Sequence, residues 1–378
     1  MMSLHPPLDF EVPLDDDLHQ FGIGLVGAGF IVRDCHIPAY LQAGFRVVGI
    51  TSRTETRARE VAAQHHLSKV YSSIDELLLD PEIQVVDLGV PPQAQPDVIR
   101  RIVSKGRFIR GILAQKPLAM SLAEAREMVA LCDSAGITLA VNQNMRHDQS
   151  VRACKDLIQR GLLGAPVLAT IEMRAIPHWM PWSRELHSLS TFVMSIHHLD
   201  CFRYWLGDPI RILASTRSDP RTTFPHSDGL NLYILEYADG GRASAWDDVW
   251  TGPAREGTAA DIGIRWRVEG TAGIARGTIG WPEYPSPVPS TIDYTIQDGT
   301  KAWHSPRWSK VWFPDAFRGT MGELLMALKR GSQPSISGRD NLQTVALVEG
   351  VFRAAREHRV VSFDELLENR SESSTAHP

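Results

Sequence analysis

The stretch Gly22–Val32 reads GIGLVGAGFIV, a short apolar segment that runs into two glycines separated by one residue. Glycine at position 27 permits a tight turn after a strand, and glycine at position 29 lets backbone N–H groups approach a pyrophosphate. The third position of the G-x-G-x-x-G pattern is Val32, so the pattern is incomplete. We expect a nucleotide-binding turn here, and an ordinary glycine turn of an α/β domain is the alternative.

From residue 21 onward, short apolar segments bounded by turns alternate with amphipathic stretches at helical spacing. Brief apolar runs are typical of buried parallel strands. Their alternation with helices predicts an α/β fold with a doubly wound sheet, whose ligand crevice lies beyond the carboxyl ends of the strands. The strands are expected at 22–27, 46–51, 84–90, 109–114 and 137–142, and the helices at 55–66, 74–79, 94–105 and 122–135.

After residue 145 the pattern changes to longer segments of period two, separated by turns, which predict an antiparallel or mixed sheet. Helical stretches close the chain. The predicted organisation is an acidic extension over 1–20, a dinucleotide-binding domain over 21–145, a second α/β domain with an open, mostly antiparallel sheet over 146–367, and a flexible tail over 368–378.

Composition argues against several classes of protein. The chain has 378 residues and a net charge of −5, so it lacks the basic excess of nucleic-acid-binding proteins. Its four cysteines form no C-x-x-C pair, which argues against zinc ribbons, iron–sulfur clusters and a disulfide framework. The first 20 residues carry no signal-like or membrane-spanning run, so we expect a cytoplasmic protein without a membrane anchor.

The end of the second predicted strand bears on the choice of dinucleotide. An acidic residue there holds the adenosine ribose of NAD, but this sequence reads Thr51-Ser52-Arg53. Ser52 and Arg53 can bind the 2′-phosphate of NADP by hydrogen bond and charge. Alternatively, Arg53 stacks on adenine while Ser52 bonds a ribose hydroxyl, so NAD and NADP both stay open, with a slight preference for NADP.

Two candidate catalytic groups follow from position. The strand at 109–114 runs into Gln115-Lys116-Pro117, which places a lysine at the carboxyl edge of the sheet, where a nicotinamide would lie. A solvated surface lysine is the alternative. In the second domain, His197 and Asp200 lie one helical turn apart, and a carboxylate at that spacing can orient an imidazole as a general base.

The segment 176–187 reads IPHWMPWSRELH and precedes the helix that carries His197. Tryptophan faces suit the apolar faces of sugar rings, while arginine and histidine suit hydroxyls or an anionic group. A loop whose tryptophans merely cover the sheet is the alternative. No metal is expected, because the spacing of the histidines and Asp200 matches no tight ligand pattern. The predicted substrate-binding residues are Arg146, His178, Trp179, Trp182, Arg184 and His197.

Together these motifs resemble the glucose–fructose oxidoreductase, inositol dehydrogenase and rhizopine-catabolism (Gfo/Idh/MocA) family over nearly all of residues 21–363. The resemblance implies a Rossmann domain, a second domain whose open sheet often joins subunits into a dimer or tetramer, and an NAD(P)-dependent reaction at a secondary hydroxyl of a sugar or cyclitol. It rests on VGAGFIV at 26–32, VPP at 90–92, QKPLA at 115–119, NQNMR at 142–146, the H-x-x-D of His197 and Asp200, and YWLGDP at 204–209.

The resemblance also implies roles for two side chains. His197 would accept the hydroxyl proton and Lys116 would hold the developing oxyanion, while hydride moves between the substrate carbon and the nicotinamide. The residues predicted to contact the dinucleotide are Gly27, Gly29, Phe30, Ile31, Ser52, Arg53, Pro91, Gln95, Gln115, Lys116 and Asn144.

Three positions depart from the family pattern. Gln115 replaces the usual glutamate before Lys-Pro, Val193 stands where inositol dehydrogenases carry aspartate, and Gln95 stands where many members carry histidine. These departures argue against an inositol substrate. Two rival functions stay open: a redox-neutral glycoside hydrolase that keeps its NAD, and a non-catalytic sugar or nucleotide sensor.

Overall fold

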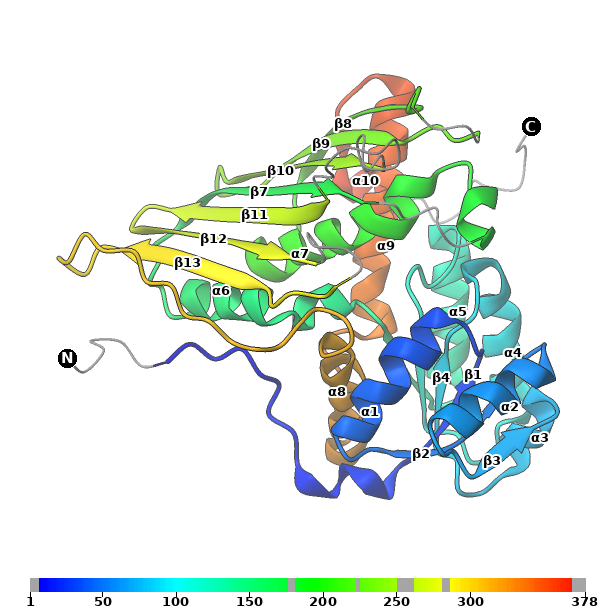
Figure 1. The fold of residues 1–378 in the computed structure, drawn as a ribbon. Helices are drawn as coiled ribbons and strands as arrows, with labels where there is room; N and C mark the ends of the chain where they lie inside the picture. Colours follow the sequence, from blue (N-terminus) through cyan, green and yellow to red (C-terminus); the bar gives the residue numbers. More distant parts are fainter. Residues whose placement is uncertain (1–6, 176–180, 222–224, 250–261, 281–285, 369–378) are drawn as a thin grey trace.

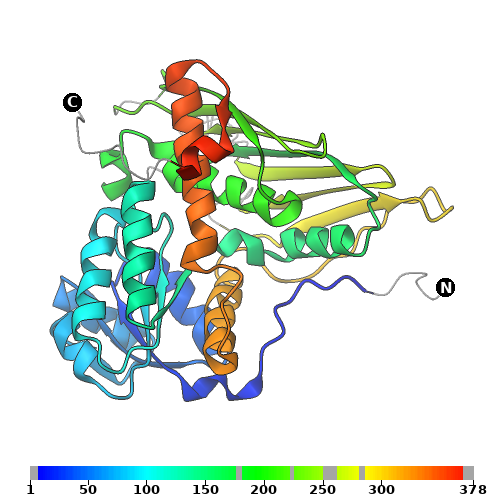
Figure 2. The same ribbon diagram turned by 180° about the vertical axis from the view of Figure 1, so that it is seen from behind.

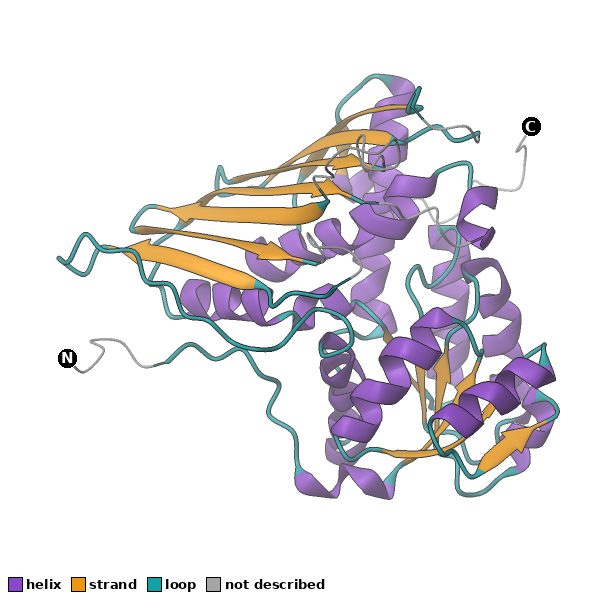
Figure 3. Cartoon of the chain, viewed as in Figure 1, coloured by secondary structure: helices purple, strands orange, loops and turns teal. Residues whose placement is uncertain are grey.

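The computed structural model describes residues 7–175, 181–221, 225–249, 262–280 and 286–368. The predicted substrate residues His178 and Trp179 and almost all of the predicted tail lie outside these ranges. Two sheets organise the rest of the chain, and each has helices packed against it (Figures 1 and 3).

The first sheet has six parallel strands in the order β3-β2-β1-β4-β5-β6. This is the strand order of a Rossmann domain, with the switch point between β1 and β4. The sequence pattern missed β3, because three residues are too few to show a period. The strands are β1 (Gly22–Val26), β2 (Arg46–Thr51), β3 (Lys69–Tyr71), β4 (Val85–Leu88), β5 (Gly111–Ala114) and β6 (Thr138–Val141).

Serine caps start two of the helices of this domain. The side chains of Ser73 and Ser121 accept hydrogen bonds from the backbone N–H groups of Glu76 and Glu124, each at 3.2 Å, which satisfies N–H groups that have no partner inside the helix. The helices are α1 (Ile37–Gln42), α2 (Glu55–Gln64), α3 (Ile74–Leu79), α4 (Gln95–Lys105) and α5 (Leu122–Ser134).

The second sheet has eight strands in the order β13-β12-β11-β7-β10-β9-β8-β14, and only the β7–β10 pair is parallel. Burial alternates along β9, which leaves Leu232 and Ile234 about half exposed on one face. Helices α6 and α7 lie on the opposite face, and α9 packs beside β8 (Figures 1 and 2). The strands are β7 (Pro166–Arg174), β8 (Arg211–Arg217), β9 (Leu230–Glu236), β10 (Arg242–Asp248), β11 (Gly263–Gly270), β12 (Gly273–Ile279), β13 (Thr291–Ile296) and β14 (Val361–Ser362), and the helices are α6 (Gln149–Gln159), α7 (Ile196–Leu206), α9 (Gly338–Glu357) and α10 (Phe363–Glu368).

Helix α8 (Ala316–Arg330) follows the second sheet in sequence but packs on the first sheet (Figure 2). Its apolar side chains, among them Phe317 and Leu324, share one core with Leu25 of β1 and Leu113 of β5. The chain then returns to β6, where the N–H of Val141 donates to the carbonyl of Ile336 at 2.8 Å. The Rossmann core is therefore completed by residues from the far end of the chain.

All four cysteines are buried and free. No helix among the described residues combines the length and the apolar character needed to span a membrane.

Candidate active site

The glycine turn has the geometry that a dinucleotide requires. Gly27 has φ +116°, and a Cβ there would lie 2.3 Å from the carbonyl oxygen of Gly89, so only glycine fits. A Cβ at Gly29 would meet no atom within 4 Å, so the space beside this exposed residue is open. Val32, at the position of the third glycine, packs against Gly89, where a Cβ would lie 2.1 Å from the valine methyl. Glycine at position 89 thus compensates for valine at position 32.

The other residues predicted at the dinucleotide site lie at the same edge of the sheet. Phe30 and Ile31 begin the helical turn after Gly29, and Ile31 opens a short π-helix, Ile31–His36. Ser52 and Arg53 follow β2, with the arginine exposed, and Pro91 follows β4. Because the carboxyl ends of parallel strands meet at one edge, these residues fit a dinucleotide that runs from the adenosine end at β2 to the nicotinamide end at β5.

Gln95 has a different role from the one that the sequence predicted. Its side chain is fully buried, and its amide nitrogen donates to the carbonyls of Gln115 and Pro117, both at 2.8 Å. Its amide oxygen accepts the N–H of Gln115 at 2.6 Å. The predicted contact with the dinucleotide is therefore wrong for Gln95. This residue instead holds the turn that carries Lys116.

A buried polar group that sequence reasoning missed lies behind Gln115. The imidazole of His36 lies 2.7 Å from the carboxylate of Asp87, and its Nε2 lies 3.0 Å from the amide nitrogen of Asn142 and 3.5 Å from that of Gln115. The amide oxygen of Gln115 accepts the N–H of Lys116 at 3.0 Å. Gln115 thus connects the lysine turn to the interior of the Rossmann domain. No spacing signal marked His36, because its partners lie far along the chain, in β4 or just after β5 and β6.

Lys116 joins the two domains. Its ammonium nitrogen donates to the backbone carbonyl of Val193 at 2.5 Å. Val193 belongs to a second π-helical segment, Thr191–Ser195, and lies one turn before His197 on the same helix face. Burial lowers the pKa of Lys116 from 10.5 to about 7. This lysine can therefore exchange a proton near neutral pH.

His197 lies inside the protein, with 2% of its surface exposed. Its ring lies nearly perpendicular to the Trp312 indole, with the ring centroids 5.7 Å apart, and its Nδ1 has no hydrogen-bond partner within the described ranges. Burial lowers the pKa of His197 well below its usual value, and the positive charge of Lys116 lowers it further. His197 is therefore a neutral imidazole at pH 7. Trp312 lies 115 positions after His197, and no sequence signal linked the two.

Asp200 does not orient His197, so the predicted pairing is wrong. Both of its carboxylate oxygens accept from the guanidinium of Arg146, at 2.5 and 2.8 Å, and Thr344 donates to it at 2.9 Å. Arg146 also pairs with Asp340 at 2.8 Å and is buried. The buried guanidinium of Arg146 is thus engaged by Asp200, by Asp340 and, at 3.2 Å, by the carbonyl of Ser335, so the structure gives Arg146 a supporting role in place of the predicted substrate contact.

Asn144 likewise supports the site from behind. It is buried, and its side-chain oxygen accepts a hydrogen bond from the Trp312 indole N–H at 2.9 Å. Its side-chain oxygen thus contacts the tryptophan that borders His197, and the contact of Asn144 with the dinucleotide stays a prediction.

A small apolar cluster lies beside the lysine and brings residues of both domains together. Trp182 and Met120 pack against its buried members Leu186, Leu189, Val193 and Val249. Arg184 is exposed in the same segment as Trp182. Across the described part of the chain, no three or more His, Cys, Asp and Glu side chains gather in a way that could hold a metal ion.

Comparison with known proteins identifies both halves of the chain. The family model described as an oxidoreductase family with an NAD-binding Rossmann fold matches residues 21–143, and the model of its C-terminal alpha/beta domain matches residues 155–363. D-apiose dehydrogenase of Paraburkholderia graminis is 25% identical over 364 residues, which cover 92% of this chain and 91% of the relative. The 1,5-anhydro-D-fructose reductase of Ensifer adhaerens is 30% identical over 202 residues, which cover 52% of this chain and 60% of the relative.

Solved structures share the fold. Levoglucosan dehydrogenase in complex with NADH superposes with a TM-score of 0.78 at 17% identity, covering 91% of this chain and 99% of the other. An oxidoreductase from Agrobacterium radiobacter in complex with NAD+, L-tartaric acid and magnesium superposes with a TM-score of 0.77 at 22% identity, covering 92% and 99%. Through both of its domains, the chain belongs to the Gfo/Idh/MocA family of oxidoreductases, and its first domain is an NAD-binding Rossmann domain.

Proposed function

We propose that this protein is an NAD(P)-dependent oxidoreductase that transfers hydride between the nicotinamide and a secondary hydroxyl or keto group of a sugar, glycoside or cyclitol. One observation carries the proposal. The Lys116 amine, at the carboxyl edge of the Rossmann sheet, donates to the Val193 carbonyl one turn before His197. A proton-exchanging amine and a neutral imidazole therefore approach the nicotinamide end of the crevice from the two domains. The names of the two sequence relatives are those of enzymes that act on sugars.

The two side chains divide the proton chemistry between them. A bound nicotinamide supplies hydride transfer to or from the carbinol carbon. The neutral imidazole of His197 donates its N–H to the oxygen of the substrate hydroxyl and orients it. Lys116, with its pKa of about 7, takes the hydroxyl proton during oxidation and returns it during reduction. From the sequence, His197 was expected to take the proton, but burial of its imidazole favours the lysine amine.

Several groups around the lysine suit a ring-shaped substrate. We infer that Trp182 and the apolar cluster around Val193 contact the apolar face of the substrate, while Arg184 reaches its hydroxyls. Valine in place of a carboxylate at position 193 supports a substrate other than inositol. It also leaves the lysine with a neutral carbonyl as its partner.

The cofactor preference, the oligomeric state and the cellular compartment are also proposals. Exposed Arg53 after β2, with no carboxylate beside it, slightly favours NADP over NAD.

The exposed Leu232 and Ile234 on the outer face of the second sheet suit an interface between copies of the chain, so we propose a dimer or tetramer through this face. Four free cysteines suit the reducing cytoplasm.

The test starts from the purified protein. Any released dinucleotide is identified by mass spectrometry after denaturation, and the native protein is incubated with free sugars, cyclitols and aryl glycosides while reduced nicotinamide and free aglycone are followed together. We expect reduced cofactor to accumulate in proportion to oxidised sugar or cyclitol. Aglycone release without net reduction would instead establish a redox-neutral glycosidase, and dinucleotide binding without turnover of any compound would indicate a sensor.

A further inference from the structure

Residues Leu8–Val12, called the strap below, lie across the outside of the second domain and run past helices α6 and α8 (Figure 1). Arg152 of α6 donates to the backbone carbonyls of Phe10 and Glu11, at 3.1 and 3.0 Å. The N–H of Asp9 donates to the carboxylate of Asp156 at 3.2 Å. An acidic extension with no partner would make none of these contacts. The strap is therefore a docked part of the fold.

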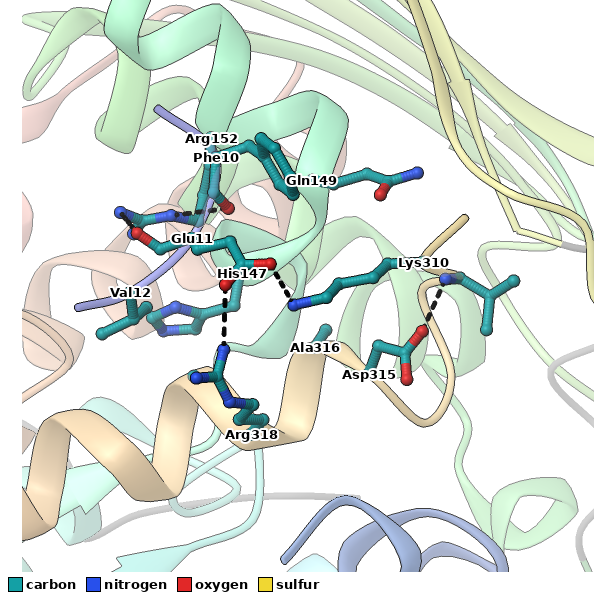
Figure 4. Close-up of a pocket in the computed structure, with 12 residues that line it drawn as sticks. Phe10, Glu11, Val12, His147, Gln149, Arg152, Lys310, Asp315, Ala316 and Arg318 are labelled. Carbon is teal, nitrogen blue, oxygen red and sulfur yellow. Dashed lines mark hydrogen bonds and ion pairs between the residues drawn. The ribbon is translucent and has the colours of Figure 1, made fainter. Parts of the chain in front are cut away.

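The strap also holds a segment that comes from far along the chain. Phe10 packs against Trp308, with the ring centroids 4.4 Å apart and the ring planes tilted by 30°. The carboxylate of Glu11 pairs with Lys310 and, at 3.4 Å, with Arg318 of α8 (Figure 4). The hydrogen bond from Lys310 lowers the pKa of Glu11, so this carboxylate is charged at neutral pH. The strap thus fastens the segment Trp308–Trp312 to helices α6 and α8.

That segment ends at the tryptophan beside His197. Trp312 is buried, its indole N–H donates to Asn144 at 2.9 Å, and its ring lies nearly perpendicular to the imidazole of His197. Only one residue, Val311, separates Lys310 from Trp312. A short path of direct contacts and chain connectivity therefore leads from the strap to the imidazole.

The space under the strap is nearly filled. The cavity that Glu11, His147, Arg152, Lys310 and Arg318 line has a volume of about 20 Å³, room for about one water molecule. This volume excludes a bound metabolite in the docked arrangement. Any role of the strap must therefore come from its own contacts with the fold and not from a ligand bound beneath it.

We propose that the strap is a positioning element of the active site: by fastening Trp308 and Lys310, Phe10 and Glu11 hold Trp312 against His197. This proposal rests on the proposed function, because it assigns His197 to the substrate site. Phe10 and Glu11 are positioning residues, since their contacts are with Trp308, Lys310 and Arg318 and not with Lys116 or His197. The contact between Phe10 and Trp308 contributes more than the ion pair, because both Glu11 and Lys310 are more than one-third exposed.

The chain offers a matched control in the residues that follow the strap. Leu14 packs against Gly322 of α8, and Asp17 pairs with Lys329 at 2.6 Å. These are again one apolar contact and one exposed ion pair between the N-terminal residues and α8. They contact the middle and the C-terminal end of α8, away from the Trp308–Trp312 segment. If the N-terminal residues only stabilised the fold, substitutions at Phe10 and Glu11 and at Leu14 and Asp17 would have the same effect on Trp312 and on activity.

The experiment compares Phe10→Ala/Glu11→Gln with Leu14→Ala/Asp17→Asn in the full-length chain labelled with 5-fluorotryptophan. The ¹⁹F resonances of Trp308 and Trp312 are assigned by single Trp→Phe variants. We expect both resonances to shift or broaden in the strap variant and to stay unchanged in the control. With a substrate from the panel, we expect the KM for the hydroxyl compound to rise roughly 3- to 10-fold in the strap variant while the Kd for the dinucleotide stays within twofold. Phe10→Tyr should restore the wild-type resonances and KM.

Unchanged Trp312 resonances in the strap variant would overturn the proposal, as would equal changes in the strap and control variants. The spectroscopic arm needs no substrate. If the protein turns over no compound, the proposed function fails while the contact between strap and Trp312 is still tested. If the resonances move but KM and kcat do not, the strap holds Trp312 without positioning the site, and the proposal is wrong.

Discussion

Lys116 and His197 come to the candidate site on supports of opposite kinds. Lys116 lies on a turn whose backbone is held by one uncharged side chain, Gln95, through hydrogen bonds to the residues on either side of the lysine, Gln115 and Pro117. His197 lies on a helix that is anchored by the buried ion pair of Asp200 with Arg146, and the neighbouring His198 imidazole lies 2.8 Å from the carboxylate of Asp247. One residue is fixed by amide hydrogen bonds and the other by a buried ion pair.

This difference predicts different losses of activity and stability when each support is removed. A turn that loses an amide partner leaves unpaired carbonyls close to the reacting group, so activity and stability fall together. A helix that loses one member of a buried ion pair keeps an unpaired charge in the interior, so stability falls first. The substitutions below test this contrast, beginning with the reacting group itself.

Replacing Lys116 should have the largest effect on turnover. We expect Lys116→Ala to lower kcat by about 10³- to 10⁴-fold while dinucleotide affinity largely persists, because the amine exchanges the proton. In the wild type, kcat/KM for oxidation should rise with pH through the pKa of about 7 and level off above it, since the free amine is the reactive form. A wild-type-like rate in Lys116→Ala would remove the lysine from the mechanism.

Lys116→Met provides the complementary stability measurement. The folded pKa is lower than that of the unfolded chain, so burying this amine destabilises the fold below pH 10.5, and the penalty is complete below about pH 7. We expect the inactive methionine variant to be more stable by about 1–3 kcal/mol at pH 7 in chemical denaturation, with the gain disappearing as pH approaches 10.5.

Asp200→Asn tests the support of the second domain. It leaves Arg146 without its bidentate partner, and we expect a loss of about 3–5 kcal/mol in the free energy of unfolding. Turnover per folded molecule should stay within about threefold, since Asp200 does not contact His197. Asp208→Asn is the matched control, because Asp208 is the half-exposed partner of Arg203 and should cost less than about 1 kcal/mol. A rate loss comparable to that of Lys116→Ala would restore Asp200 to the mechanism.

Gln95→Leu tests the support of the lysine. It removes the partners of the carbonyls of Gln115 and Pro117, and we expect a loss of about 2–3 kcal/mol together with a roughly tenfold fall in kcat. Exposed Gln93 lies at the same helix start, so Gln93→Leu should change neither quantity. If Gln95→Leu lowered stability but left kcat intact, the contrast between the two supports would not hold.

The smallest expected effect is at the adenosine end of the crevice. Ser52→Asp places a carboxylate where a 2′-phosphate would lie, and should raise the Kd for NADP about tenfold relative to that for NAD. Thr54→Asp, two residues farther on, controls for added surface charge. An unchanged Kd for NADP in Ser52→Asp would show that this end of β2 does not face the 2′ position.

The sequence predicted the fold class, the glycine turn and the placement of Lys116 because each depends on short-range pattern: apolar runs, a turn, and the end of a strand. It failed where partners come from distant segments. The one-turn spacing of His197 and Asp200 suggested a pair, but Arg146 reaches Asp200 from 54 positions away and offers two hydrogen bonds to its carboxylate. Trp312, Asn142 and His36 were missed for the same reason, because tertiary contacts leave no mark in local spacing.

Helix α8 has a consequence for synthesis on the ribosome. The Rossmann strands leave the exit tunnel long before the residues that cover them. Leu25 and Leu113 pack in one core with Phe317 and Leu324, and Val141 of β6 hydrogen-bonds to Ile336, and these partners are synthesised much later. At the usual rate of chain elongation, roughly 10–40 s pass between the emergence of residue 141 and that of residue 336. During that interval the nascent chain exposes an apolar sheet face, which chaperones that bind such surfaces would recognise. A truncated chain that ends near residue 145 should therefore aggregate rather than fold as an independent nucleotide-binding module.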